Sequence, residues 1–128
     1  MRAVLLSETG GPEVLRIQDL PTPQPSQGQA LIRVRAASVN PIDWKYRSGR
    51  SPKQLPAVLG NDISGTVERS LADELAEGDE VFGFAPTGGY AEYAVSPAQV
   101  LARKPDGVSH TQAAALSGSS KTPPARSG

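Results

Sequence analysis

The chain has 128 residues, enough for one domain with a modest hydrophobic core, and its 13 glycines and 12 prolines suit short strands joined by turns. It has no cysteine and one histidine, which excludes disulfide bonds, thiolate catalysis and cysteine-ligated metal sites. The net charge is zero, and no apolar run has the length of a membrane span or a signal peptide, so we expect a cytoplasmic protein with no membrane partner.

The first part of the chain predicts three strands. Residues 1–7 alternate apolar and polar positions, and the turn signal at residues 10–14 should return the chain so that a second strand, around Ile17, pairs with the first. The proline-rich residues 20–28 predict an extended connection. Residues 29–39 carry the clearest alternation, so we expect a strand with one face buried and the other in water.

Residues 40–49 change to a helical pattern with a cap at each end. Asn40 is a good N-cap, Pro41 suits the first helical position, and Asp43 stands where a capping box has its acid. Gly49 can close the helix in the left-handed conformation. We therefore predict a helix of about two turns over this segment.

Further short strands are predicted after a loop. Residues 63–69 form a strand pattern whose interior Gly65 indicates a bulge or a close backbone approach. Residues 80–84 predict another strand, and two more are expected at residues 90–95 and 98–104. Brief strands at this spacing are typical of a small, partly open β-barrel.

The end of the chain divides into the start of a helix and a tail. Ser109 and Gln112 stand at capping-box spacing at the start of a helix over residues 109–116. Residues 117–128 have almost nothing apolar to bury, so we expect them to be disordered. The predicted organisation is one domain, residues 1–116, followed by this tail.

Basic side chains are densest in the predicted helix and just after it. One interpretation is attraction of an anionic ligand such as a cofactor phosphate, and the other is a solvated loop that needs no ligand. No basic face interleaved with aromatic residues accompanies them, so no nucleic-acid partner is expected. The basic residues are Lys45, Arg47, Arg50 and Lys53.

Five short motifs follow one another along the chain. In this order and spacing they resemble the N-terminal GroES-like catalytic domain of the medium-chain dehydrogenase/reductase superfamily, in its zinc-free quinone oxidoreductase branch, over about residues 1–116. The resemblance implies a mainly β fold, a GroES-like, partly open β-barrel with short helices. The motifs are GGPEVL at 10–15, A-x-x-x-NPID-x-x-x-RSG at 36–49, LPAVLGNDISGTV at 55–67, GDEVFG at 78–83 and GGYAEY at 88–93.

The resemblance implies hydride transfer from NADPH to a small-molecule carbonyl substrate, a quinone or a conjugated enone. Zinc-dependent members of the superfamily carry a cysteine at the position of Asn40 and a His-Glu pair at the positions of Asn61 and Asp62. Amide side chains are poor zinc ligands, so no metal is expected here. Without a metal, the developing oxyanion must be stabilised by hydrogen-bond donors or a proton source.

The resemblance also suggests site residues, each with an alternative role. Asn40 would face the nicotinamide, or would act only as the helix N-cap. Asp62 would hold a hydrogen-bond network below the pocket. Tyr46 and Lys45 would reach a carbonyl or a phosphate, or would lie on the surface, and Gly89 would approach a ligand closely, or would only turn the chain. The predicted catalytic residues are Asn40, Tyr46 and Asp62, and the predicted cofactor-binding residues are Asn40, Pro41, Lys45 and Gly89.

No G-x-G-x-x-G or related glycine-rich turn follows a predicted strand, so the Rossmann domain that follows in the family is lacking from this sequence. We therefore expect a truncated substrate-side domain that is weakly active or inactive alone. Its exposed interdomain face, including parts of residues 40–50 and 110–116, should favour self-association. The alternative is a freestanding GroES-like binding module without catalysis.

Overall fold

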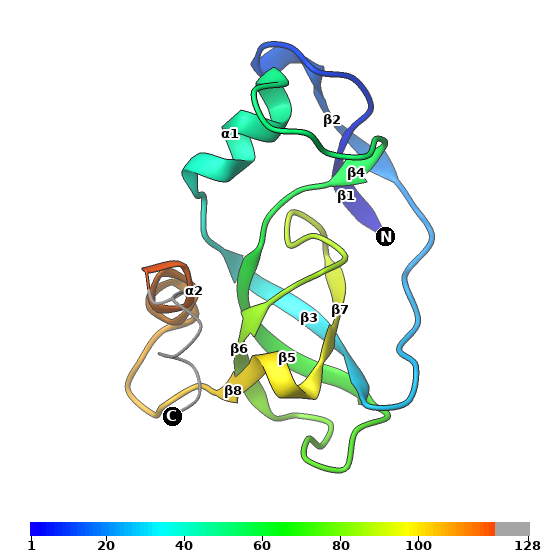
Figure 1. Ribbon diagram of the computed structural model, residues 1–128. Helices are drawn as coiled ribbons and strands as arrows, with labels where there is room; N and C mark the ends of the chain where they lie inside the picture. Colours follow the sequence, from blue (N-terminus) through cyan, green and yellow to red (C-terminus); the bar gives the residue numbers. More distant parts are fainter. Residues whose placement is uncertain (120–128) are drawn as a thin grey trace.

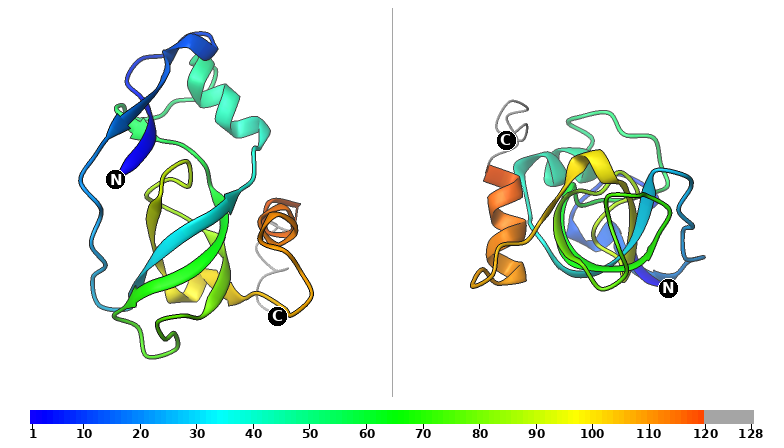
Figure 2. Two further views of the ribbon diagram at one scale, coloured as in Figure 1. Left: turned by 180° about the vertical axis from the view of Figure 1, so that it is seen from behind. Right: turned by 90° about the horizontal axis from the view of Figure 1, so that it is seen from below.

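The computed structural model describes residues 1–119, and in this range the chain forms two antiparallel sheets and two α-helices (Figure 1). A three-stranded sheet has the order β2-β1-β4, and a five-stranded sheet has the order β7-β3-β5-β6-β8. Neither sheet closes on itself. Seen from below, the longer sheet curls around a common interior (Figure 2), so the predicted mainly β, partly open barrel is confirmed.

The strands are β1 (Arg2–Leu6), β2 (Leu15–Asp19), β3 (Gln29–Ala37), β4 (Ala57–Val58), β5 (Asp62–Ser70), β6 (Glu80–Phe84), β7 (Tyr93–Pro97) and β8 (Leu101–Arg103), and the helices are α1 (Pro41–Ser48) and α2 (His110–Ser119). Helix α1 and the three-stranded sheet lie at one end of the molecule, and α2 lies beside the barrel (Figure 1). None of the helices within residues 1–119 is long and apolar enough to cross a membrane.

The barrel interior is filled by small and branched apolar side chains from four strands and the turn after β6. The sheet closes tightly there because Gly65 lacks a side chain: a Cβ atom at this position would lie 2.2 Å from the carbonyl oxygen of Arg33 on β3. The pairing of β3 with β5 also shifts register between Val34 and Ala36. The close approach predicted at Gly65 is therefore confirmed. The core residues are Ala30, Ile32, Ile63, Val67, Val81, Ala85 and Ala94.

Two predicted strands begin three residues later in the structure. The strand predicted over residues 90–95 begins at Tyr93, because the preceding residues cross to the other sheet, where Ala91 bridges to Ala3 and the carbonyl of Tyr90 accepts the N–H of Val4. The strand predicted over residues 98–104 begins with a short 3₁₀ turn, and β8 starts at Leu101.

Helix α2 begins as predicted but runs further. Ser109 and Gln112 form the expected capping box, with backbone-to-side-chain distances of 3.0 and 3.1 Å. The helix continues to Ser119, so residues 117–119 are helical rather than part of a disordered tail, since a helix started at a good cap extends at little cost. The rest of the predicted tail, residues 120–128, lies outside the described residues.

Candidate functional site

Asn40 and Asp62 meet at the junction between α1 and the barrel. The side-chain amide of Asn40 donates to the Asp62 carboxylate over 2.9 Å and lies 3.4 Å from the hydroxyl of Ser38. Asp62 starts β5 and is 2% exposed, whereas Asn40 precedes α1 and is half-buried. The backbone N–H of Ser38 also donates to the carbonyl of Asp62 over 3.0 Å. The structure therefore brings together two of the three predicted catalytic residues.

Asp43 joins three segments around this pair. Its carboxylate is 5% exposed and accepts the backbone N–H of Asn40 at 2.9 Å, the hydroxyl of Tyr90 at 2.8 Å and the backbone N–H of Gly60 at 3.3 Å. The bond to Asn40 closes the predicted capping box at the start of α1. A buried carboxylate is tolerated here because donors from three parts of the chain satisfy it and the helix N-terminus favours negative charge.

The glycine loop after β6 lies against the segment before β5. Gly89 donates its N–H to the carbonyl of Gly60 over 2.8 Å, and Tyr90 donates its N–H to the carbonyl of Leu59 over 3.0 Å. A Cβ atom on Gly89 would lie 2.4 Å from the Ile63 side chain. The absence of a side chain at Gly89 thus lets the loop pack against the barrel, and the predicted close approach of a ligand to Gly89 stays a prediction.

The other predicted site residues lie outside this network. Tyr46 packs its ring against a small apolar cluster that contains Leu6 and Leu59, and the Lys53 ammonium lies 5.0 Å from the centre of that ring. Lys45 is exposed on the same helix, and Pro41 is the first residue of α1. The structure therefore places the Tyr46 ring in a packing position, and its catalytic role stays a prediction.

The junction carries an amide and two carboxylates rather than thiolate or imidazole groups. Asn40 directs the N–H group of its amide at Asp62, and a neutral amide nitrogen donates hydrogen bonds rather than binding metals. Within residues 1–119, no group of three or more His, Asp or Glu side chains is arranged to hold a metal ion. The junction can instead orient an amide and offer a hydrogen bond to a polar ligand.

Comparison with known proteins agrees with this architecture. The family model for the alcohol dehydrogenase GroES-like domain matches residues 26–106. The chain belongs to this family. The predicted membership of the medium-chain dehydrogenase/reductase superfamily is confirmed, and the family is one of oxidoreductases.

Three relatives show how much of a larger protein the GroES-like domain represents. The quinone oxidoreductase of Pongo abelii is 40% identical over 122 residues, which are 91% of this chain and 37% of the relative. The solved quinone oxidoreductase from Coxiella burnetii has a TM-score of 0.88 at 37% identity, covering 95% of this chain and 42% of that one. A mycobacterial protein solved with NADPH has a TM-score of 0.81 at 44% identity, covering 86% of this chain and 34% of that one. The chain thus spans well under half the length of these relatives.

A second polar cluster attaches α2 to the barrel of the GroES-like domain. His110 lies with Nδ1 2.6 Å from the hydroxyl of Ser64 and with Nε2 3.3 Å from the Glu80 carboxylate. The serine–histidine–carboxylate order resembles a hydrolase triad, but Ser64 is 0% exposed and no substrate can reach its hydroxyl. The cluster is therefore an attachment point. The sequence does not predict it because Ser64 and His110 are 46 positions apart and no single motif contains both.

Acid should weaken this attachment. Burial lowers the pKa of His110 below 6.5. The negative charge of Glu80 on β6 acts to raise this pKa, whereas the positive charges of Lys104, after β8, and Arg35, on β3, lower it. A lowered pKa in the folded state means that the stabilisation is fully present above about pH 6.5 and is lost as the pH falls through the folded-state value. We expect the single histidine to titrate below 6.5 by NMR, and α2 amides to lose protection between pH 7.5 and 5.5.

Two results would separate this effect from general acid weakening. His110→Gln should abolish the pH dependence of α2 protection in this window, while amides of β3 remain protected throughout. Unchanged α2 protection from pH 7.5 to 5.5 in the unsubstituted chain would contradict the role given to His110.

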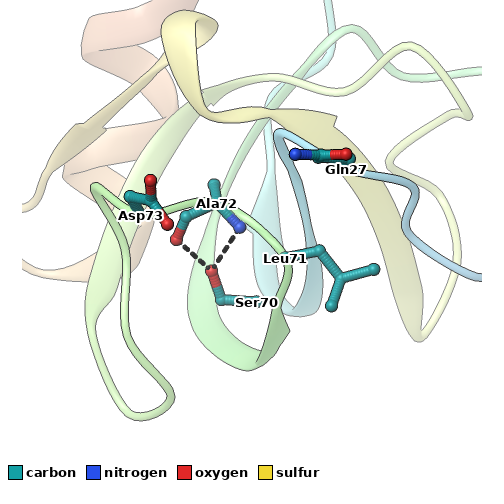
Figure 3. A pocket seen from close by; sticks show the side chains of 5 residues that line it. All are labelled: Gln27, Ser70, Leu71, Ala72 and Asp73. Atoms are coloured by element: carbon teal, nitrogen blue, oxygen red, sulfur yellow. Dashed lines mark hydrogen bonds between the residues drawn. The ribbon is translucent and has the colours of Figure 1, made fainter.

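A surface hollow of about 410 Å³ lies elsewhere on the domain, at the far end of β5 (Figure 3). Gln27, Ser70, Leu71, Ala72 and Asp73 line it, and the Ser70 hydroxyl bonds to both the N–H and the carbonyl of Ala72 over 3.1 and 2.9 Å. The hydroxyl is thus engaged within its own turn. Neither Asn40 nor Asp62 lines this hollow, so it is separate from the candidate site.

Proposed function

We propose that this GroES-like domain is the substrate-side part of a zinc-independent, NADPH-dependent oxidoreductase that reduces quinones or conjugated enones. The similarity to a quinone oxidoreductase and to a mycobacterial protein solved with NADPH supports the substrate class and the cofactor. The observation that carries the proposal is the bond between Asn40 and Asp62, because it aligns an amide donor where zinc-dependent members have metal ligands.

The Asn40 amide has two N–H groups, and the structure holds them unequally. One is bound to the buried Asp62 carboxylate over 2.9 Å, a charge-assisted bond that fixes the plane of the amide. The second has the longer, 3.4 Å contact with the Ser38 hydroxyl. A weak contact of this length exchanges easily. The second N–H is therefore the donor that would turn to a substrate carbonyl and stabilise the negative charge that develops on its oxygen.

NADPH, when bound, would supply the hydride, and this chain would form one wall of its site. The half-buried amide of Asn40 and the exposed ammonium of Lys45 fit a polar or anionic ligand. The family resemblance suggests that Pro41 and Gly89 would border it. A nucleotide-binding domain would provide the opposite wall. Hydride transfer needs cofactor and substrate held in register, which a single wall does poorly.

We expect weak or no oxidation of NADPH when the chain alone is mixed with a simple quinone. Any residual turnover should fall about a hundredfold in Asn40→Ala, the usual cost of losing one oxyanion donor, and should persist in the matched variant Asn61→Ala. Turnover is measured as loss of NADPH absorbance with protein and quinone at equal concentration. Fast turnover would overturn the one-wall argument, and residual turnover that survives Asn40→Ala would overturn the role of the amide.

Exposed apolar side chains favour a second candidate, a GroES-like module that binds another protein or a second copy of itself. Val39 is 81% exposed next to Asn40, Trp44 on α1 is 44% exposed, and Leu116 on α2 is 48% exposed. Large apolar side chains exposed in this way can be covered when a partner binds. This candidate would be preferred if the chain bound a partner tightly in the absence of NADPH.

A further inference from the structure

The hydroxyl of Tyr90 touches the chain on both sides of Asn40. It donates to the Asp43 carboxylate over 2.8 Å and lies 3.4 Å from the carbonyl oxygen of Ser38. Tyr90 is 47 positions from Asp43 and belongs to the glycine loop that follows β6. The short bond to Asp43 is the one that the single hydroxyl proton makes.

One oxygen of Asp43 connects Tyr90 to Asn40. Oδ2 accepts both the Tyr90 hydroxyl at 2.8 Å and the backbone N–H of Asn40 at 2.9 Å, while Oδ1 lies 3.3 Å from the N–H of Gly60. The carboxylate is buried, so these bonds act in a medium where they are strong. A shift of the Tyr90 hydroxyl would therefore move the Asp43 carboxylate and, with it, the backbone of Asn40. The side-chain amide of Asn40, which bonds to Asp62, would move with that backbone.

The ring of Tyr90 is held independently of its hydroxyl. Its backbone N–H donates to Leu59, the neighbouring Gly89 donates to Gly60, and the ring packs against a cluster that includes Leu6. Burial, with a further contribution from Asp43, raises the pKa of Tyr90 above its usual value of 10.0. The hydroxyl therefore remains a protonated donor throughout the neutral range and does not serve as an acid for the reaction.

We propose that Tyr90 is a positioning residue: through Asp43, its hydroxyl sets the orientation in which the Asn40 amide meets Asp62 and a substrate carbonyl. This inference rests on the proposed function, since it deepens the role given there to Asn40. It assigns to the GGY motif a task beyond turning the chain. A purely structural tyrosine would be replaced by phenylalanine without effect on the amide.

The chain has two asparagines, Asn40 and Asn61, so asparagine-selective ¹⁵N labelling gives two side-chain amides that are easily distinguished. In Tyr90→Phe, hydrogen exchange at the Asn40 backbone N–H and at its side-chain amide should become about tenfold faster or more, the effect of weakening a bond to a charged group. The two proton shifts of the Asn40 amide should also approach each other as the bond to Asp62 loosens. Asn61 should change little.

The matched control is Tyr93→Phe on β7, a half-buried tyrosine whose hydroxyl has no hydrogen bond to the described residues. It should leave both asparagines unchanged. An unchanged Asn40 in a folded Tyr90→Phe variant would overturn the inference. If that variant fails to fold, the unsubstituted chain gives the answer: a slowly exchanging Tyr90 hydroxyl proton with cross-relaxation to the Asn40 N–H supports the inference, and a rapidly exchanging one overturns it.

These measurements use no cofactor or substrate. A failure of the proposed reduction, with Asn40 still responding to Tyr90→Phe, would therefore count against the oxidoreductase role alone. An active protein whose Asn40 ignores the substitution would count against the positioning role alone.

Discussion

Replacing Asp43 with alanine is expected to lower the free energy of unfolding by about 3–5 kcal/mol, because three donors lose the acceptor they share and remain in a poorly hydrated junction. The donors come from the start of α1, from Gly60 and from Tyr90, so no single segment can move to satisfy them all. For a chain of this size the midpoint of thermal unfolding should fall by roughly 10–20 °C. Urea titration and thermal unfolding, both followed by circular dichroism, measure these two quantities.

The control is Asp106→Ala, which removes an exposed carboxylate from the turn before α2. Exposed substitutions of this kind change stability by about 0.5 kcal/mol or less. A loss for Asp43→Ala no larger than that of the control would show that the carboxylate does not hold the three segments together.

Replacing Gly88 with alanine is expected to cost about 3–5 kcal/mol for a different reason. Gly88 has φ of 97°, and a Cβ atom there would lie 2.2 Å from the carbonyl oxygen of Val58 on β4. The added methyl group therefore meets backbone, which cannot rotate away, and the residue also adopts a conformation that alanine disfavours. The loop after β6 would have to separate from β4, and Tyr90 would move with it.

A substitution at Gly78 distinguishes the cost of the positive φ from the cost of the contact with Val58. It has φ of 92°, nearly that of Gly88, but no atom lies within 4 Å of its Cβ position. Gly78→Ala should therefore show only the conformational cost, about 1–2 kcal/mol. Equal losses in the two variants, measured by urea unfolding, would mean that the contact with Val58 is relieved at no cost.

The sequence predicts most elements of this fold because their signals are local. Helix α1 has its N-cap, its capping-box acid and its closing Gly49 within ten positions, and all three are found in the structure. Gly65 is also identified correctly, since a glycine inside a strand weakens it and commonly marks a bulge or a close backbone approach. Strand β4, in contrast, is two residues long and exists because Leu5 and Leu6 of β1 offer it a partner. No periodicity is visible over so short a segment.

The candidate site shows the same difference between local signals and contacts that depend on the fold. Asn40 and Asp62 are suggested by family motifs, and the structure joins them, but the bond between them could not be derived from a spacing of 22 positions. The sequence identifies Asp43 only as a capping residue, because its contacts with Gly60 and Tyr90 depend on how the loop after β6 folds back. Tyr46 packs against an apolar cluster, a contact that its place in a motif does not predict, and its catalytic role stays a prediction.

The attachment of α2 has a practical consequence for protein engineering. Any polypeptide fused after Ser119 would take its direction from this helix, whose first turn is fastened to the barrel through His110 and Ser64. A reporter joined there by a rigid linker should therefore sample a wider range of orientations in mildly acidic buffer. With one fluorophore on the barrel and one on the reporter, energy transfer between them would report the protonation of one imidazole.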